Sequence, residues 1–464
     1  MKEYKPRIVD RILKRKLKGI GAVLIQGPKW CGKTTTAEQI AGSVLYMADP
    51  KNEAQNMTLA ELDPQRLLEG KTPRLIDEWQ LAPPLWDAVR YEVDHRDGLG
   101  QFILTGSAVP PSSDHIRHTG TGRFIWLTMR PMSLYESQES TGDVSLAELF
   151  NSPEKITGTN TLDLDKLAFL TCRGGWPRAI GFTDETALDQ AAGYYDAVVH
   201  SDISRADGRL RNPERVKLFM KSYARNQGTQ ATSEVIRQDM EANDMKALDS
   251  STVYSYIRAL ERIFVIEELK AWNPNLRSKT TIRTSNTRFF VDPSIAAAAL
   301  GVGPGDLTAD LKTFGLLFEA MCIRDLRVYA EALNGDVYHF LDKTGLVCDA
   351  VIHLRNGSYG LIEIKIGGDK LIEEGAENLK KLREKLDTEK MKEPSILMVL
   401  TGTGQYAYRR SDGVYVVPLG CLKDWSSIYS EFWQFEESKT AKTGDCMRHL
   451  QKQDPEYEWT RCQI

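Results

Sequence analysis

The residues best suited to chemistry lie near the N-terminus, in the stretch AVLIQGPKWCGKTTT. Its spacing GxxxxGK[ST] places two glycines where the backbone can wrap a phosphate, and the N–H groups that open the next helix point at that phosphate. The lysine would reach the β- and γ-phosphates, and the threonine hydroxyl would bind Mg²⁺. We therefore predict a site for ATP and Mg²⁺ that is formed by Gly27, Pro28, Gly32, Lys33, Thr34 and Thr35.

Two later stretches end in polar side chains that the same chemistry needs. In TPRLIDEWQ an apolar run leads into Asp77 and Glu78. Asp77 would hold Mg²⁺ through water, and Glu78 would polarise the attacking water. In GQFILTGSA a further apolar run ends in Thr105 and Ser107, which we expect between the phosphate loop and the acids. The alternatives are a strand that ends in solvated acids and a turn rich in serine and threonine.

An arginine in a glycine-flanked loop is the next catalytic candidate. Arg123 precedes the apolar run of HTGTGRFIWLTMRPMSLYE, and an arginine that reaches a γ-phosphate can stabilise the charge of the transition state. It could act on its own nucleotide or, in a homo-oligomer, on that of a neighbour; a surface arginine is the other interpretation. His115 and His118 are spaced like helical metal ligands but have no third partner nearby, so we interpret them as loop histidines.

A second group of charged residues lies in CDAVIHLRNGSYGLIEIKIGG, which has the pattern of two strands around a turn. Asp349, Glu363 and Lys365 follow the order D…ExK of metal-dependent nucleases, in which two carboxylates hold Mg²⁺ and the lysine positions or activates water. Glu319, in the preceding predicted helix, could point into the same site as a partly buried acid. The alternative is a nuclease-like fold kept for binding or assembly, with Glu363 and Lys365 as an ion-paired strand end.

The turn decides whether these acids share one face of the sheet. With a two-residue turn at 356–357, Asp349 and Glu363 lie on opposite faces, because a slip of one residue moves every side chain to the other face. A three-residue loop over 355–357, with Gly357 in the left-handed conformation, brings Asp349 opposite Glu363. The metal-site hypothesis therefore predicts the three-residue loop.

Between the two groups the sequence predicts helices followed by a hairpin. Apolar residues at helical spacing mark ATSEVIRQDMEA and DSSTVYSYIRALERI, and cap residues precede the second run. Two β-runs follow, FVIEELKAW and TRFFVDP. This order indicates a winged helix, whose second helix enters the DNA major groove in DNA-binding examples. The candidate DNA contacts are Arg258, Arg262, Arg277, Lys279 and Arg283. The alternative is a packing module, because Glu261, Glu267 and Glu268 dilute the positive charge.

The order of several motifs resembles a prokaryotic family of AAA-type ATPases in which a C-terminal domain of unknown function follows the ATPase core: GPKWCGKTTTAEQ, LIDEWQ, ILTGSA, GR before RPMSLYES, and RGGWPRAI. The resemblance extends to about residue 425. It implies an AAA+ core with a helical lid, a winged helix, and a C-terminal domain similar to PD-(D/E)XK nucleases, with Glu319 as its helical acid. Relatives often carry an acid two positions before the aspartate, where this chain has Val347.

We therefore expect an α/β multidomain protein divided into an AAA+ P-loop core (1–135), a helical lid (136–204), a winged helix (205–300), a PD-(D/E)XK nuclease-like domain (301–424) and a polar tail (425–464). A chain of 464 residues is too long for one ordinary core, which agrees with several domains.

Composition excludes some classes of function and narrows the partners. The sequence has no apolar run near the roughly 20 residues of a membrane span, and its seven cysteines, without a CxxC pair, favour a reducing cytoplasm. A net charge of −4 gives no global attraction to nucleic acid. We expect a cytoplasmic Mg²⁺-dependent ATPase without a membrane partner that acts on nucleic acid through a local basic surface. The alternative is an ATP-dependent switch or scaffold whose inactive nuclease-like domain binds a protein.

Overall fold

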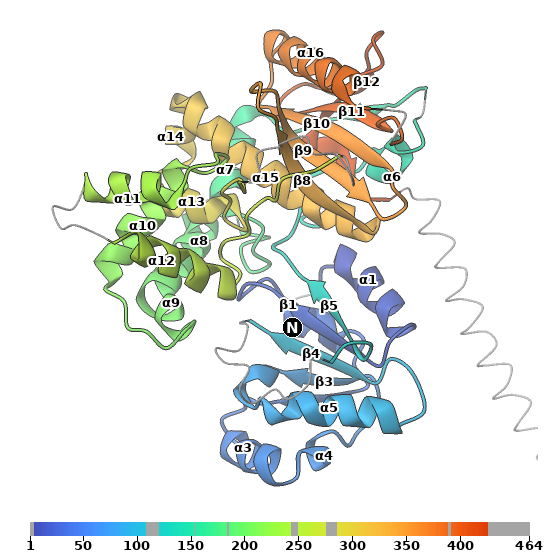
Figure 1. Cartoon of the computed structure of the whole chain (residues 1–464), viewed down its shortest axis with the longest axis vertical. Helices are drawn as coiled ribbons and strands as arrows, with labels where there is room; N and C mark the ends of the chain where they lie inside the picture. The colour runs from blue at the N-terminus through green and yellow to red at the C-terminus, as the bar shows by residue number, and fades with distance from the viewer. Residues whose placement is uncertain are drawn as a thin grey trace, which may run out of the picture.

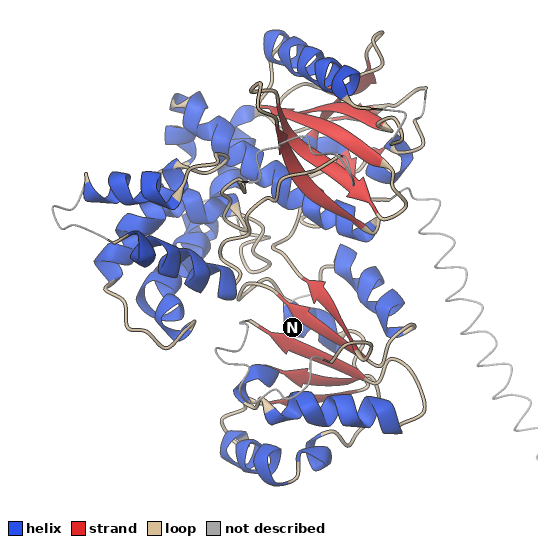
Figure 2. Cartoon of the chain, viewed as in Figure 1, coloured by secondary structure: helices blue, strands red, loops and turns tan. Residues whose placement is uncertain are grey.

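The computed structural model describes residues 4–107, 120–152, 154–182, 185–242, 249–274, 285–387 and 391–425. Its three parts are a sheet near the N-terminus, a helical middle and a second sheet near the C-terminus (Figures 1 and 2). Several predicted residues lie outside the described ones: His115, His118, Arg277, Lys279, Arg283 and the tail after residue 425. No helix in the described part of the chain is long and apolar enough to cross a membrane.

The first sheet consists of five parallel strands: β1 (Ala22–Gln26), β2 (Ser43–Tyr46), β3 (Arg74–Asp77), β4 (Phe102–Gly106) and β5 (Phe124–Thr128). Their spatial order is β2-β3-β4-β1-β5. Strand β4 is buried along its whole length and β1 as far as Ile25, as expected of strands covered on both faces. The helices of this part are α1 (Ile8–Leu17), α2 (Lys33–Glu38), α3 (Glu53–Leu62), α4 (Pro64–Leu67) and α5 (Pro84–His95), with a 3₁₀ turn at Trp79–Leu81.

The middle part is helical. It contains α7 (Leu164–Arg173), α8 (Glu185–Ala197), a π-helical turn (Val198–Asp202), α9 (Ile203–Arg205), α10 (Pro213–Arg225), α11 (Ser233–Glu241), α12 (Ser250–Arg262) and α13 (Pro293–Leu300). Asp249 caps α12 by accepting a hydrogen bond from the N–H of Ser251, as its sequence predicted. After α12, Leu269 and Thr287 exchange backbone hydrogen bonds of 2.9 Å in each direction. The predicted order of two helices and an antiparallel pair is therefore present.

The second sheet consists of seven strands in the order β7-β12-β13-β11-β10-β9-β8. Their bounds are β7 Gly158–Thr159, β8 Gly335–Leu341, β9 Val347–Leu354, β10 Tyr359–Lys365, β11 Ile396–Thr401, β12 Tyr406–Arg409 and β13 Tyr415–Pro418. β8, β9 and β10 form an antiparallel meander, and α16 (Asp369–Lys385) connects β10 to the parallel β11. The long helix α15 (Leu311–Ala332) packs against β8, β9 and β10, and the short α14 (Pro304–Ala309) precedes it.

The start of the expected helical lid belongs instead to the C-terminal part, which corrects the prediction for 136–204. β6 (Val144–Ser145) pairs with β14 (Leu422–Lys423), and β7 pairs with β12. The short α6 (Leu146–Leu149) lies between β6 and β7, and a 3₁₀ turn (Leu419–Cys421) precedes β14. These strands of two residues carry no periodic pattern, so tertiary pairing alone places them.

Candidate functional site

The glycine-rich loop joins β1 to α2 with the strand–loop–helix geometry that its motif predicted. Gly27 has a φ of 153°, and a Cβ at this position would lie 2.0 Å from the carbonyl oxygen of Met129. Gly32, the N-cap of α2, has a φ of 99°. Both positions require glycine because an L side chain disfavours these angles, and Gly27 has no space for one.

Lys33 lies buried inside this loop. Its Nζ donates hydrogen bonds to the carbonyl oxygens of Gly27 at 3.0 Å and Pro28 at 2.7 Å. Thr34 and Thr35 follow it in the first turn of α2. The loop therefore surrounds the ammonium group of Lys33. Phosphate oxygens bound by the backbone N–H groups of the loop would also lie close to this positive charge.

Asp77, at the end of β3, is bound by two hydroxyl groups. Thr34 Oγ1 and Thr105 Oγ1 each donate to Asp77 Oδ1 at 2.6 Å. The three side chains meet because β4 lies between β1 and β3 and all three parallel strands end at the same edge. Hydroxyl and carboxylate oxygens are the ligands that Mg²⁺ prefers, so Thr34 and Asp77 fit this ion.

Glu78 lies immediately beyond that cluster, in the left-handed conformation with a φ of 56°. Gln80 Nε2 donates to Glu78 Oε2, and Ser107 Oγ donates to the same oxygen at 3.4 Å. Ser107 therefore lies within hydrogen-bond distance of the acid, and its role between the phosphate loop and the acids stays a prediction. A positive φ at a non-glycine residue is uncommon, and such strain tends to occur at functional positions.

Arg123 does not lie at this site, which overturns its action on the nucleotide of its own chain. It immediately precedes β5, and its carbonyl oxygen accepts from the N–H of Ala22 at the start of β1. The strands are parallel, so Arg123 is at the edge opposite to the phosphate loop. Its guanidinium pairs with Asp94, at 2.7 Å from Nε to Oδ1. Action on a neighbouring subunit remains a prediction.

The middle part lies directly over the phosphate loop. Lys29 Nζ pairs with Asp202 Oδ1 at 2.6 Å, and the rings of Trp30 and Tyr194 are 5.9 Å apart. A Cβ at Gly32 would lie 3.6 Å from Pro177 Cγ, so the RGGWP corner contacts the loop as well. The turn of RGGWP buries Trp176.

Arg7 also contacts the loop, and the sequence carried no signal for this role. Its Nη1 donates to the carbonyl oxygen of Cys31 at 2.8 Å, and its Nε pairs with Glu136 Oε1 at 3.0 Å. Both charged side chains are buried. The segment before α1 therefore connects the phosphate loop to RPMSLYES, because Glu136 belongs to that motif.

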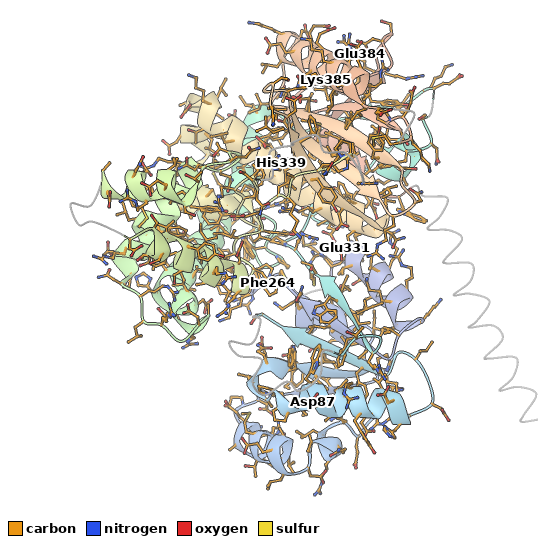
Figure 3. The ribbon with its side chains drawn as sticks, in the orientation of Figure 1. Asp87, Phe264, Glu331, His339, Glu384 and Lys385 are labelled. Carbon is orange, nitrogen blue, oxygen red and sulfur yellow. The ribbon has the colours of Figure 1, made fainter. Side chains whose placement is uncertain are left out.

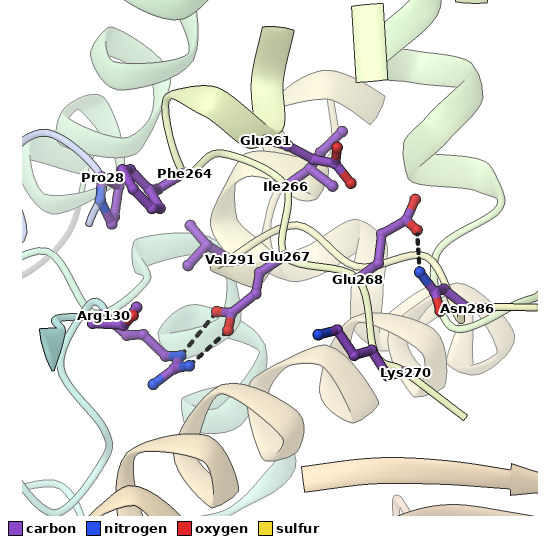
Figure 4. Close-up of a pocket in the computed structure, with 11 residues that line it drawn as sticks. Pro28, Arg130, Glu261, Phe264, Ile266, Glu267, Glu268, Lys270, Asn286 and Val291 are labelled. Carbon is purple, nitrogen blue, oxygen red and sulfur yellow. Dashed lines mark hydrogen bonds and ion pairs between the residues drawn. The ribbon is translucent and has the colours of Figure 1, made fainter. Parts of the chain in front are cut away.

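A cavity of about 290 Å³ lies between the phosphate loop and the hairpin segment (Figure 4). Pro28 and Phe264 face each other on one side of it, and Arg130 and Glu267 form an ion pair of 2.6 Å on another. Arg130 also pairs with Glu331 of α15 at 2.9 Å. Phe264 and Glu331 both lie where the parts of the protein meet (Figure 3).

The register of β9 and β10 is the one that the metal-site hypothesis required. Gly357 has a φ of 82°, and the N–H of Leu354 donates to the carbonyl oxygen of Ser358 at 2.8 Å. The pairs observed from Tyr359 to Ile362 continue to Asp349 opposite Glu363. The two-residue turn is therefore excluded, and the acids share a face of the sheet.

Lys365 holds the two acids together. Its Nζ donates to Glu363 Oε2 at 2.7 Å and to Asp349 Oδ2 at 3.2 Å. Asn378 of α16, which the sequence did not indicate, donates to Glu363 Oε1 at 2.7 Å and to the carbonyl oxygen of Val347. Burial and the charge of Asp349 raise the pKa of Glu363 to about 7, although Lys365 opposes this.

Glu319 completes the predicted set from α15. Burial, followed by the charge of Asp349, raises its pKa well above the usual value. A Cβ at Gly228 would lie 3.1 Å from Glu319 Oε2, so a turn of the middle part lies against this carboxyl. Among the described residues, no three His, Cys, Asp or Glu side chains are arranged to hold a metal ion. In the present arrangement Lys365, rather than a metal ion, interacts with the carboxylates of Asp349 and Glu363.

Of the predicted DNA contacts, the described ones lie on α12. Arg258 is exposed and Arg262 is half-buried. Glu267 forms an ion pair with Arg130, and Glu268 forms one with Arg288. The acids that seemed to dilute the positive charge are therefore partly neutralised within the fold.

Three families match successive parts of the sequence. Residues 20–138 match the AAA domain, residues 164–306 match a domain of unknown function (DUF8612), and residues 314–422 match another domain of unknown function (DUF4143). No curated protein matches the chain. Among solved structures, the helicase domain of Hef from Pyrococcus furiosus is similar at 12% identity, covering 92% of this chain and 98% of that one. The TM-score of 0.20 gives no support for a shared fold.

The AAA match and the site agree with each other. The parallel sheet, the glycine-rich loop and the acids at the end of β3 are consistent with a P-loop core, and the matched family supports an AAA-type ATPase. The C-terminal match is to a domain without an assigned function.

Proposed function

We propose that this protein binds ATP with Mg²⁺ and hydrolyses it at the C-terminal edge of the first sheet. The observation that carries the proposal is the convergence of Thr34 and Thr105 on Asp77, both at 2.6 Å, beside the buried Lys33. Such an arrangement is suited to bind one cation and the phosphate chain of one nucleotide at this edge of the first sheet.

Each residue has a distinct role in the proposed reaction. The loop N–H groups and Lys33 bind and orient the phosphates, and Thr34 and Asp77 would hold the Mg²⁺, which neutralises phosphate charge. Glu78 accepts a proton from the attacking water, and Ser107 keeps its carboxylate in place through their hydrogen bond of 3.4 Å. Arg123 contributes only in a homo-oligomer, where it could stabilise transition-state charge at a neighbour's nucleotide.

Phosphate release tests this proposal. Lys33→Ala should lower the rate by roughly a hundredfold or more, because a charge directed at the transferred phosphate is lost. Glu78→Gln should still bind ATP with little turnover. Lys51→Ala changes an exposed lysine in the same part of the protein and serves as the control. Normal hydrolysis by a folded Lys33→Ala protein would refute the assignment.

A second candidate function is hydrolysis of phosphodiester bonds at Asp349, Glu363 and Lys365. The observation that favours it is the register of the hairpin, which brings both acids to Lys365. Two carboxylates and a lysine are suited to a divalent cation and its water, provided that Lys365 moves out of its ion pairs. We take nucleic acid as the substrate because phosphodiester bonds join its nucleotides.

Cleavage of plasmid and linear DNA with Mg²⁺ or Mn²⁺ decides this second function. Wild-type protein should cut, and Glu363→Ala should not, whereas Glu374→Ala on the exposed face of α16 should retain activity. If neither wild type nor variant cuts while ATP hydrolysis is intact, the protein is better described as an ATP-dependent switch or scaffold. Its C-terminal domain would then bind a protein partner.

A further inference from the structure

A groove with about 340 Å³ of space lies on the middle part, and its lining includes none of the residues of either proposed site. One wall is the turn over residues 207–209, which follows α9, and the other is the exposed side of α12. α9 and α12 contact each other and lie side by side in Figure 1. The groove is therefore built by two elements of one compact part.

Arg211 fixes the first wall. Its two terminal nitrogens pair with the two oxygens of Asp207, both at 2.7 Å, and Nη2 also donates to Ser255 Oγ on α12 at 3.1 Å. The same arginine donates to the carbonyl oxygen of Ile203. This bidentate pair ties the turn to α12 and occupies Asp207, the only acid among the described residues that line the groove.

The second wall is a stripe along α12. Ser251, Tyr254, Ser255, Arg258 and Arg262 recur at spacings of three and four residues, so they lie on one face over three turns of helix. The opposite face of α12 is buried against α10 and α11. Packing therefore explains one side of α12 and leaves the polar stripe unexplained.

Three arginines face this groove without an acidic partner. Within the described part of the chain, no carboxylate pairs with Arg209, Arg258 or Arg262. The guanidinium of Arg258 lies 5.0 Å from the ring of Tyr254, which is 52% exposed. Arg130, by contrast, pairs with Glu267 within the fold. Unpaired positive charge concentrated in one groove indicates a ligand with negative charge.

We propose that this groove binds the phosphate backbone of nucleic acid. Guanidinium groups donate in a fork that matches phosphate oxygens, and the two serine hydroxyls add neutral donors between them. The exposed Tyr254 offers a flat apolar surface for a sugar or a base. The spacing along α12 spans about 16 Å at 1.5 Å per residue, enough for several successive phosphates. The binding requires neither ATP nor the carboxylates of the C-terminal part.

Fluorescence anisotropy with labelled DNA tests the proposal on the full-length protein. A random 20-base-pair duplex and a single strand of equal length are titrated at several salt concentrations. Binding should weaken steeply with salt, and Arg258→Ala and Arg262→Ala should each weaken it roughly tenfold and reduce the salt slope by about 1. Arg209→Ala tests the opposite wall in the same way. Whichever DNA binds more tightly, duplex or single strand, identifies the form of nucleic acid that the groove prefers.

The controls separate this groove from general charge and from the ATP site. Arg225→Ala removes the same charge from α10, outside the groove, and should change the affinity by less than about twofold. Lys33→Ala should bind DNA like the wild type without nucleotide, so the ATPase proposal can fail independently. The proposal is overturned if the folded triple variant of Arg209, Arg258 and Arg262 binds DNA like the wild type. It is also overturned if the wild type binds no DNA at low salt, or if polyglutamate of equal charge competes as well as DNA.

Discussion

Replacement of Arg130 tests whether the junction of the three parts depends on charge. Arg130 Nη2 and Nε bind the two oxygens of Glu267, at 2.6 and 2.8 Å, and Arg327 approaches Glu267 at 3.5 Å. Burial alone would raise the pKa of Glu267, but the two arginines outweigh it and lower the pKa to about 2. Arg130→Met keeps the volume of the side chain while removing its charge.

The expected magnitude follows from that pKa. A carboxyl with a pKa of 4.5 in the unfolded chain and about 2 in the folded protein stabilises the fold by about 3 kcal/mol at neutral pH. The Glu267 side chain keeps 28% of its exposure, so solvent screening reduces this contribution. Arg327 also remains beside Glu267. We therefore assign about 2 kcal/mol to the interaction between Arg130 and Glu267.

The sign of the pH dependence follows from the lowered pKa. Between pH 4.5 and 2 the unfolded chain holds more protons at Glu267 than the folded protein does. The stabilisation is therefore complete above about pH 4.5 and is lost as the pH falls toward 2. The coupling between Arg130 and Glu267 should diminish over the same range.

A double-mutant cycle measures this coupling. Arg130→Met, Glu267→Gln and the double variant are unfolded in urea and followed by tryptophan fluorescence, at pH 7 and in steps toward pH 3. The exposed pair of Lys217 and Glu214 on α10 serves as the control and should couple by less than about 0.5 kcal/mol. A coupling this small for Arg130 and Glu267 at pH 7, or one that is constant with pH, would refute the reasoning.

Three further predictions concern single positions. Thr105→Val removes the hydroxyl that binds Asp77 and should lower the ATPase kcat roughly tenfold while ATP affinity, measured by calorimetry, changes little. Gly27→Ala would bring a methyl group to 2.0 Å from the carbonyl oxygen of Met129, so calorimetry should detect no ATP binding, and near-normal affinity would contradict the loop geometry. Gly357→Ala has open space but a φ of 82°, so it should lower the unfolding free energy by about 1 kcal/mol in urea titrations; no change would mean that the turn is not left-handed.

The sequence was informative wherever chemistry depends on a short local pattern. The phosphate loop follows from the four specified positions of GxxxxGK[ST], and the register of β9 and β10 follows from Gly357 together with the requirement that two acids share a face. One of the two interpretations of Arg123, action on the nucleotide of its own chain, could have been excluded from the order of the strands. Arg123 precedes β5, whereas Gly27 follows the neighbouring strand β1. Because the two strands are parallel, a residue before one and a residue after the other lie at opposite edges of the sheet. Arg123 and Gly27 therefore could not meet within one chain.

Other features lie beyond local patterns. Arg7 is one of several basic residues before and within an amphipathic helix, and nothing in their spacing marks the one that reaches the phosphate loop. β6 and β7 are two residues each and exist only because β14 and β12 pair with them. Asn378 lies on α16, and nothing in its local sequence marks it; only the fold brings it to Glu363.

A buried network of charges holds the RPMSLYES and RGGWPRAI motifs in place. Arg324 of α15 is 2% exposed and pairs with Asp292 at 2.9 Å and Asp325 at 2.7 Å. Asp325 accepts from the N–H of Leu134 in RPMSLYES, and Asp292 accepts from the N–H of Gly175 in RGGWPRAI. Breaking one such buried pair costs about 3–5 kcal/mol, because a charge is left uncompensated. Any motion that follows ATP hydrolysis should therefore rotate the parts of the protein relative to one another while these ion pairs and hydrogen bonds stay intact.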